Sequence, residues 1–256
     1  MDFAAGFGDI SLLQLALVAA VALCANILGG IAGYGTGALL PLVLVPMVGA
    51  LPVVPIITIS ALFTNVSRLL AFRRYADWRR AAIALVAAIP TCVLGAWGYT
   101  FLTGKGAAIV IGAMLIISVP VRRLMKHRGI QFSDAGFAAG AAGYGVLVGG
   151  TAGSGVVMLS LLMAAGLQGA AVVATDAVIS IVISLVKLSV FGLAGVLTPQ
   201  IIALAILIGL AAMPGAYIAR LLVERMPVHF HTAILDAVVL FGGAFMIIAA
   251  VTGPSA

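Results

Sequence analysis

The chain has 256 residues, of which 64% are hydrophobic and 8% are charged, and its formal net charge is +6. A soluble domain carries about 25% charged residues, so this composition excludes a soluble globular protein. The positive charge does not indicate nucleic-acid binding. Eleven of the thirteen basic residues lie at predicted helix ends or in short loops, which is how basic residues are distributed in membrane proteins.

Long apolar segments recur along the chain and predict helices that cross a membrane. A helix needs about 20 apolar residues to cross a bilayer, and segments near this length cover residues 10–28, 81–102, 107–121, 169–190, 201–222 and 232–251. These segments are continuously apolar and do not alternate, which favours helices over a membrane β-barrel. We therefore predict an all-α polytopic membrane protein.

The first predicted helix, residues 10–28, is followed by a glycine-rich stretch. Five of the nine residues from 29 to 37 are glycine, and each glycine costs a helix about 1 kcal/mol relative to alanine. The apolar segment that follows, residues 38–50, would cover only about 20 Å as a helix, which is too short to cross about 30 Å of hydrocarbon. Residues 10–50 therefore form either one interrupted crossing or a hairpin that returns to its starting side.

A second copy of this pattern lies 120 residues downstream. Residues 149–164 match residues 29–44 at seven of sixteen positions without gaps, including four glycines. Residues 94–102 also align with residues 214–222. The chain is therefore predicted to consist of two tandem repeats, residues 1–128 and 129–256, as is common among transporters.

The distribution of basic residues indicates how the two repeats are oriented. If residues 10–50 cross once, the repeats are parallel and nine basic loop residues face one side and three the other. If these residues form a hairpin, the repeats are inverted and the counts become eleven against one, Lys105. The positive-inside rule favours the second arrangement. We predict two inverted repeats, each a glycine-broken hairpin plus three transmembrane helices, in a bacterial inner membrane with both termini on the outer face.

The glycine-rich breaks are candidates for binding an anion. Irregular backbone at membrane depth is tolerated where protein or a water-filled cavity satisfies it. The short helix after each break would begin near residues 35–38 or 155–157, and free amides at a helix N-terminus attract anions. Glycine lets the anion approach the backbone closely. The alternative is that these glycines only allow close helix packing.

Polar residues inside the apolar segments complete the predicted site. Arg68 and Lys187 occupy equivalent positions in the two repeats and could bind the anion, or could extend their charged ends to the membrane surface. Asp176 is a candidate for coupling transport to protons, or could cap a helix or form an ion pair. The predicted substrate-binding residues are Asn26, Gly33, Tyr34, Gly35, Thr36, Gly37, Asn65, Arg68, Gly153, Ser154, Gly155 and Lys187.

The paired glycine-rich stretches "GGIAGYGTGALLPLVL" and "GGTAGSGVVMLSLLM", with "DWRRAAIALVAAIPTCVLGAWGYTFL" at residues 77–102, resemble the sulfite exporter (TauE/SafE) family of membrane transporters over nearly the whole chain. The resemblance implies transport of small sulfur-containing anions such as sulfite, sulfoacetate and related organosulfonates. An anion channel of the same architecture is the alternative function. A serine hydrolase at Ser154 is disfavoured, because no histidine lies within a predicted helix near it to act as a base.

We accordingly expect a transporter and not an enzyme, without a bound cofactor or metal, and with coupling to H⁺ or Na⁺ left open. The expected partners are a small organosulfur anion and the lipid bilayer, and no nucleic acid. An oligomer of identical chains is compatible with the sequence, since the apolar helix faces do not distinguish lipid from protein.

Overall fold

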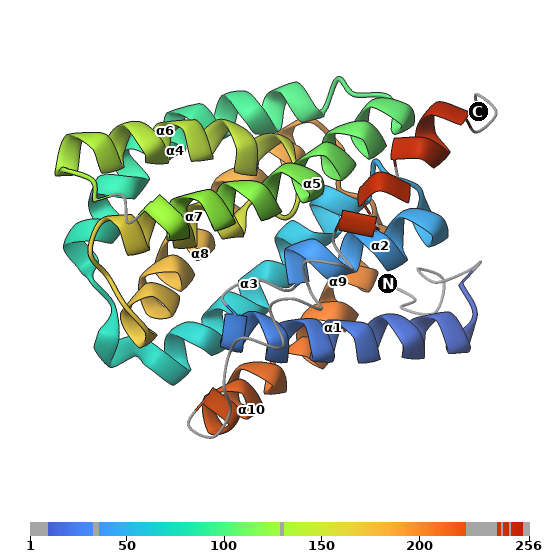
Figure 1. The fold of residues 1–256 in the computed structure, drawn as a ribbon. Coiled ribbons are helices and arrows are strands. Elements are labelled where there is room, and N and C mark those ends of the chain that lie inside the picture. The colour runs from blue at the N-terminus through green and yellow to red at the C-terminus, as the bar shows by residue number, and fades with distance from the viewer. Residues whose placement is uncertain are drawn as a thin grey trace.

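The structure is a computed structural model that describes residues 10–32, 36–128, 131–223, 240–241, 243–245 and 247–252. These residues are helical throughout, apart from short connections, and no strand occurs among them (Figure 1). A 3₁₀ turn, η2 (Arg73–Tyr75), precedes α4. The helices are α1 (Leu12–Ala32), α2 (Thr36–Val48), α3 (Val53–Phe72), α4 (Trp78–Tyr99), α5 (Gly104–Arg128), α6 (Asp134–Gly150), α7 (Gly155–Ala164), α8 (Ala170–Leu193), α9 (Pro199–Ala212) and α10 (Pro214–Val223).

Six helical segments within the described residues are long and apolar enough to cross a membrane. This confirms the prediction of a polytopic helical membrane protein. The predicted continuous helix over residues 201–222 is wrong in one detail, because the structure divides it into α9 and α10 at Met213. Pro214, which begins α10, has no backbone N–H and so cannot continue the hydrogen-bond ladder of α9. Most of the predicted helix over residues 232–251 lies outside the described residues.

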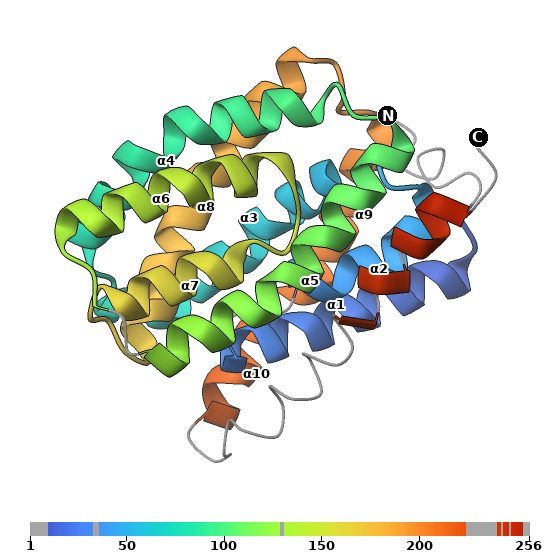
Figure 2. The ribbon, with the colours of Figure 1, turned by 45° about the horizontal axis from the view of Figure 1, so that its top comes forward.

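The glycine-rich breaks produce two helical hairpins. In Figure 2 the chain turns back after α1 to form α2, and turns back after α6 to form α7. The short helices begin at Thr36 and Gly155, as predicted. The second turn uses Gly153 at φ +84°, a backbone conformation that glycine adopts without steric cost.

The tips of the two hairpins touch each other. A Cβ atom added to Gly37 would lie 3.1 Å from the backbone nitrogen of Gly153 and 3.3 Å from its Cα. This close approach of backbone to backbone requires glycine on both sides. Segments more than a hundred residues apart in the chain therefore meet at their breaks.

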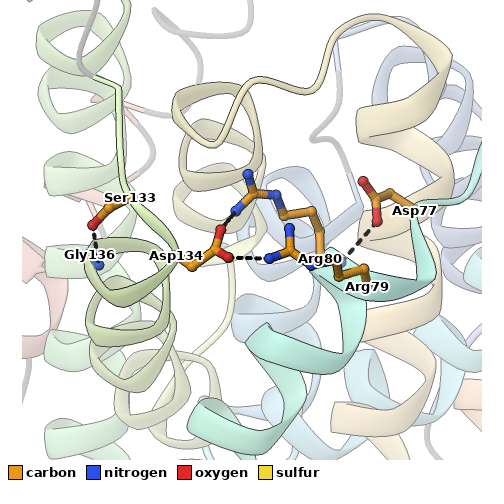
Figure 3. Close-up of polar contacts among 6 residues, drawn as sticks. All are labelled: Asp77, Arg79, Arg80, Ser133, Asp134 and Gly136. Carbon is orange, nitrogen blue, oxygen red and sulfur yellow. Dashed lines mark hydrogen bonds and ion pairs between the residues drawn. The ribbon is translucent and has the colours of Figure 1, made fainter.

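Helices α4 and α6 lie side by side and run in the same direction. A Cβ atom on Gly145 would lie 2.4 Å from the Ala88 carbonyl oxygen, and one on Gly149 would lie 2.3 Å from that of Cys92. Small residues at such an interface let two membrane helices approach closely. At the beginning of both helices, the Arg79 and Arg80 side chains form ion pairs with Asp134 (Figure 3).

Helices α1 and α10 make a contact that matches the one between α4 and α6. Helix α10 packs against α1, and a Cβ atom on Gly215 would lie 3.0 Å from the Leu23 carbonyl oxygen. Helix α4 also packs against α8, and α9 also packs against α3. Helix α4 thus packs against α6 and α8, and the segment formed by α9 and α10 packs in the same way against α1 and α3.

Helices α3 and α8 form the centre of the bundle and run in opposite directions. The end of α3 meets the beginning of α8, where Ala71, Phe72 and Ala174 form a small buried cluster. The opposite ends also meet, because Tyr99 donates a hydrogen bond to the Ala50 carbonyl, just before α3, and its ring lies 5.9 Å from that of Phe191 near the end of α8.

Basic residues gather at one end of the bundle. Arg220 donates a hydrogen bond to the Ala71 carbonyl oxygen at 3.2 Å, which places it beside the basic turn Arg73–Tyr75. The opposite end holds Lys105 at the beginning of α5. Figure 1 shows the beginning of α1 and residues 247–252 at this second end.

Candidate functional site

A cavity of about 110 Å³ lies where the two hairpin tips meet the central helices α3 and α8. Most of the side chains and glycines that the sequence singles out line this cavity, although they come from four different helices and from the break before α7. Those present in its wall are Thr36, Gly37, Asn65, Arg68, Gly153, Ser154, Gly155, Asp176 and Lys187. Gly33, Tyr34 and Gly35 lie outside the described residues.

Two helices begin at this cavity. Thr36 is the first residue of α2 and Gly155 is the first residue of α7, and both residues line the cavity wall. Ser154, at the N-cap of α7, makes no side-chain capping hydrogen bond. The first amides of an α-helix have no partner within the helix, and together with the helix dipole they favour negative charge at this end.

Arg68 lies on α3 and is only 6% exposed. Its Nη2 atom donates a hydrogen bond to Oδ1 of Asn26 at 3.1 Å, whereas its Nε atom has no hydrogen-bond partner. Asn26 in turn donates to the Ala212 carbonyl oxygen at 2.7 Å. Asn26 is not among the residues of the cavity wall; its side chain binds the Arg68 guanidinium and links α1 to the end of α9.

Lys187 lies on α8 and is also 6% exposed. Its Nζ atom donates hydrogen bonds to the carbonyl oxygens of Val148 at 2.7 Å and Thr151 at 3.4 Å. The ammonium group therefore satisfies carbonyls that the break after α6 leaves without helical partners, where the dipole of α6 favours a cation. Because both Arg68 and Lys187 are buried, neither extends its charge to the membrane surface.

The cavity-facing residues of α3 and α8 occur at the same intervals. In α3 they include Ile57, Ala61, Asn65 and Arg68, and in α8 Asp176, Ser180, Ser184 and Lys187. Taken in order, each residue of the α3 set lies 119 residues before its partner in the α8 set. The spacings within each set put its members on one face of the helix. Because the two helices are antiparallel, Arg68 lies toward the level of Asp176, and Lys187 toward that of Ile57.

Asp176 does not have either of the structural roles that the sequence suggested. The N-cap of α8 is Gly169, and it makes no side-chain capping hydrogen bond. The ion pairs found among the described residues involve Asp134 only, so Asp176 forms none with Arg68. The Asp176 side chain is 4% exposed, and its Oδ1 atom has no hydrogen-bond partner within the part of the chain that the structure describes. It therefore presents an unsatisfied carboxyl oxygen inside the protein beside the cavity.

Sequence reasoning missed two residues of the cavity wall, Tyr144 and Thr151. Tyr144 is 2% exposed on α6, and the sequence signal for it is a phenol between two glycines in a helix whose other polar residue, Asp134, lies at its beginning. Thr151 contributes a backbone carbonyl to Lys187, which no side-chain pattern predicts. The hydroxyl groups of Thr58 and Ser180 also line the wall, although each alone carries little information in a membrane helix, since Thr58 donates to its own helix at Val54.

Together these features define a polytopic helical membrane protein with a small polar cavity at the junction of two broken hairpins, lined by two cations and two helix N-termini. The family model described as sulfite exporter TauE/SafE matches residues 18–246, which is most of the chain. The chain belongs to the sulfite exporter TauE/SafE family. This membership indicates a membrane transporter of sulfite or related anions. No curated protein and no solved structure matches the chain.

Proposed function

We propose that this protein is a secondary transporter that moves small sulfur-containing anions, sulfite or sulfonates such as sulfoacetate, across the bacterial inner membrane by alternating access. The observation that carries the proposal is the convergence of both glycine-rich breaks and two buried cations on one cavity. A cavity of about 110 Å³ has room for several water molecules, and so for an anion of a few heavy atoms.

The donors around the cavity are suited to a sulfite or sulfonate group. Such a group presents three oxygens that accept hydrogen bonds in different directions. The amides at the beginning of α2 and α7 approach from the two tips, and the Nε atom of Arg68, which none of the described residues hydrogen-bonds, approaches from α3. Charge-assisted hydrogen bonds of this kind are about twice as strong as neutral ones, and they would offset the loss of the anion's hydration shell.

The packing supports the proposal that residues 1–128 and 129–256 are inverted repeats. The central helices α3 and α8 run in opposite directions and carry matching polar positions. The contact of α4 from the first repeat with α6 from the second has its counterpart in the contact of α10 from the second repeat with α1 from the first. Transporters with inverted repeats bind substrate near the midplane at the junction of the repeats, which is the position proposed for this cavity.

The basic end of the bundle is proposed to face the cytoplasm, with both termini outside. Arg73, Arg74 and Arg220 lie at this end, and Lys105 lies at the other, as the positive-inside rule requires. A cysteine that replaces Arg74 should resist a membrane-impermeant thiol reagent in intact cells, and a cysteine that replaces Lys105 should react. The reverse labelling pattern, in a variant lacking Cys24 and Cys92, would overturn this orientation.

Alternating access requires two bodies that move relative to each other around the site. Helices α4 and α6 are packed backbone against backbone and should move as one body. The counterpart body would include α1 and α10, which pack together in the same way. The two hairpin tips meet between them.

The experiment that tests the function is counterflow of ³⁵S-labelled sulfite in proteoliposomes. We expect saturable uptake that unlabelled sulfite inside the vesicles accelerates, since a carrier returns faster when loaded. Lys187→Met should abolish uptake, and Lys105→Met, which removes an exposed lysine distant from the cavity, should not. Uptake that does not saturate and does not respond to internal sulfite would instead identify an anion channel.

A further inference from the structure

Asp176 breaks the symmetry of the cavity wall. Arg68 and Lys187 are both cations at paired positions, and Asn65 and Ser184 are both polar, but the partner of Asp176 is the apolar Ile57. Asp176 is also the one acidic residue among those that line the cavity. Its carboxyl group is buried without a cap, an ion pair or a hydrogen bond to Oδ1. A carboxyl group that is costly to bury, with an oxygen that has no hydrogen-bond partner among the described residues, calls for a functional explanation.

The groups that face Asp176 determine how its charge affects an anion. The ionisable groups that line the same cavity are Arg68 from α3, Tyr144 from α6 and, about three turns further along α8, Lys187. Helices α4 and α7 contribute no acid or base to the cavity wall. The basic turn Arg73–Tyr75 lies just beyond, against the beginning of α8. With Asp176 ionised the cavity carries a formal charge of +1, and with Asp176 protonated it carries +2.

An ionised Asp176 and a bound anion repel each other in the same small cavity. Repulsion between like charges is strong in a low-dielectric interior, so the anion binds more tightly when the carboxyl group carries a proton. By linkage the effect is reciprocal: the bound anion also favours the proton. Coupling between two such sites typically changes affinity 5- to 150-fold.

We propose that Asp176 is the proton-binding group of the transporter and that one proton crosses the membrane with each anion. This inference rests on the proposed transport function. The proton leaves water on the side where the anion enters, binds a carboxyl oxygen of Asp176, and returns to water when the anion departs on the other side. Neither proton nor anion is consumed.

The position of Asp176 fits this role. The neighbouring Thr175 accepts a hydrogen bond from the backbone N–H of Asp77 at 2.9 Å, next to the basic end of the bundle. Asp176 therefore lies on the side of the cavity toward that end, and Lys187, about three helical turns further along α8, lies toward the other. Because the Asp176 carboxyl group lies on one side of the substrate, it can respond to the pH of one compartment at a time.

The test uses isethionate as the probe, because a sulfonate does not titrate near neutral pH and any pH dependence then belongs to the protein. Calorimetry on the purified wild-type protein should show affinity that rises as pH falls, with uptake of a proton on binding in weak buffer. Asp176→Asn should bind isethionate tightly at every pH without proton uptake, and Asp176→Glu should restore the pH dependence. Ser189→Ala is the matched control and should behave like wild type, because Ser189 is an exposed residue of α8 that does not line the cavity and donates to the Leu185 carbonyl of its own helix.

Flux measurements give an independent readout. In proteoliposomes with an imposed pH gradient, the wild type should accumulate isethionate, whereas Asp176→Asn should exchange isethionate but no longer accumulate it. Proton-driven accumulation by Asp176→Asn would overturn the proposal, as would accumulation that requires Na⁺. Loss of binding in this variant for aminosulfonates such as taurine, but not for isethionate, would instead make Asp176 a ligand for an ammonium group.

Measurements on the wild-type protein alone distinguish a failure of the proposal for Asp176 from a failure of the proposed transport function. If the wild type binds isethionate, sulfite or sulfoacetate without taking up a proton at any pH, the proposal for Asp176 is wrong and the proposed function stands. If the wild type neither binds nor transports any of these anions, the proposed function falls and the coupling proposal falls with it.

Discussion

Replacement of Gly155 by alanine tests whether the hairpin glycines form an anion site or only allow close helix packing. Gly155 begins α7 and lines the cavity, and a Cβ atom added to it meets no atom within 4 Å. The new methyl group would therefore occupy the cavity without displacing protein atoms. It is close in size to a water molecule, so it takes space that an anion would need in a cavity of about 110 Å³.

The expected loss of affinity follows from the hydrogen bonds that the methyl group prevents. If the anion is displaced from the first amides of α7, it loses at least one hydrogen bond to a charged group, which is worth about 1.5–3 kcal/mol. Since about 1.4 kcal/mol corresponds to a tenfold change in the dissociation constant, affinity should fall by about 10- to 100-fold. The free energy of unfolding should be unchanged or raised by up to about 1 kcal/mol, because alanine favours the helix.

The measurement is isothermal calorimetry with sulfite and isethionate, accompanied by thermal unfolding in detergent. Gly143→Ala is the control, because Gly143 is a helical glycine of α6 that meets no atom within 4 Å and does not line the cavity. It should leave affinity unchanged. The reasoning would be refuted by a Gly155→Ala protein that binds these anions as tightly as the wild type does, or by one that loses affinity only as it loses stability.

Two further predictions concern the framework that holds the cavity. Gly149→Ala should lower the free energy of unfolding by about 1–3 kcal/mol, because its Cβ atom would lie 2.3 Å from the Cys92 carbonyl oxygen. Thermal unfolding measures this loss of stability. A Gly149→Ala protein as stable as the Gly143→Ala protein would contradict the packing of α4 on α6. Asn26→Ala should cost about 1–3 kcal/mol, since it leaves the buried Ala212 carbonyl and Arg68 Nη2 without their partner, and should also weaken anion binding. Unchanged anion affinity in Asn26→Ala would show that Asn26 does not hold Arg68 in position.

The broken hairpins were predictable because their cause is local. Each glycine disfavours a helix, and the recurrence of the pattern 120 residues later separated these glycines from those inside helices such as α6. Arg68 and Lys187 were equally visible, since an ionisable residue inside an apolar segment is expensive and usually functional. Their burial against one cavity is the part that the structure adds.

Other features depend on contacts between distant segments and leave no local signal. Asn26 stood out as a polar residue in an apolar helix, but its partner is the carbonyl of Ala212, 186 residues away, and any residue can supply a carbonyl. The position of Asp176 near the beginning of a helix suggested a cap, and the lack of a partner for its carboxyl group emerges only when the neighbouring helices are in place. Tyr144 reaches the cavity because α6 packs against α4 through glycines, which fixes the rotation of the helix.

The two cations occupy equivalent positions but are held differently, and this difference bears on how the site could work. Arg68 has a planar guanidinium group with fixed donor directions, and the side-chain amide of Asn26 holds one of its nitrogens. Lys187 is a compact charge on a flexible chain, and its partners are two backbone carbonyls at the break after α6. An anion that competes for the ammonium group would therefore draw it away from the break, whereas the guanidinium would stay in place. Binding at Lys187 would then change the hydrogen bonding of one hairpin and leave the other fixed, so that a nearly symmetric wall could support an asymmetric response to substrate.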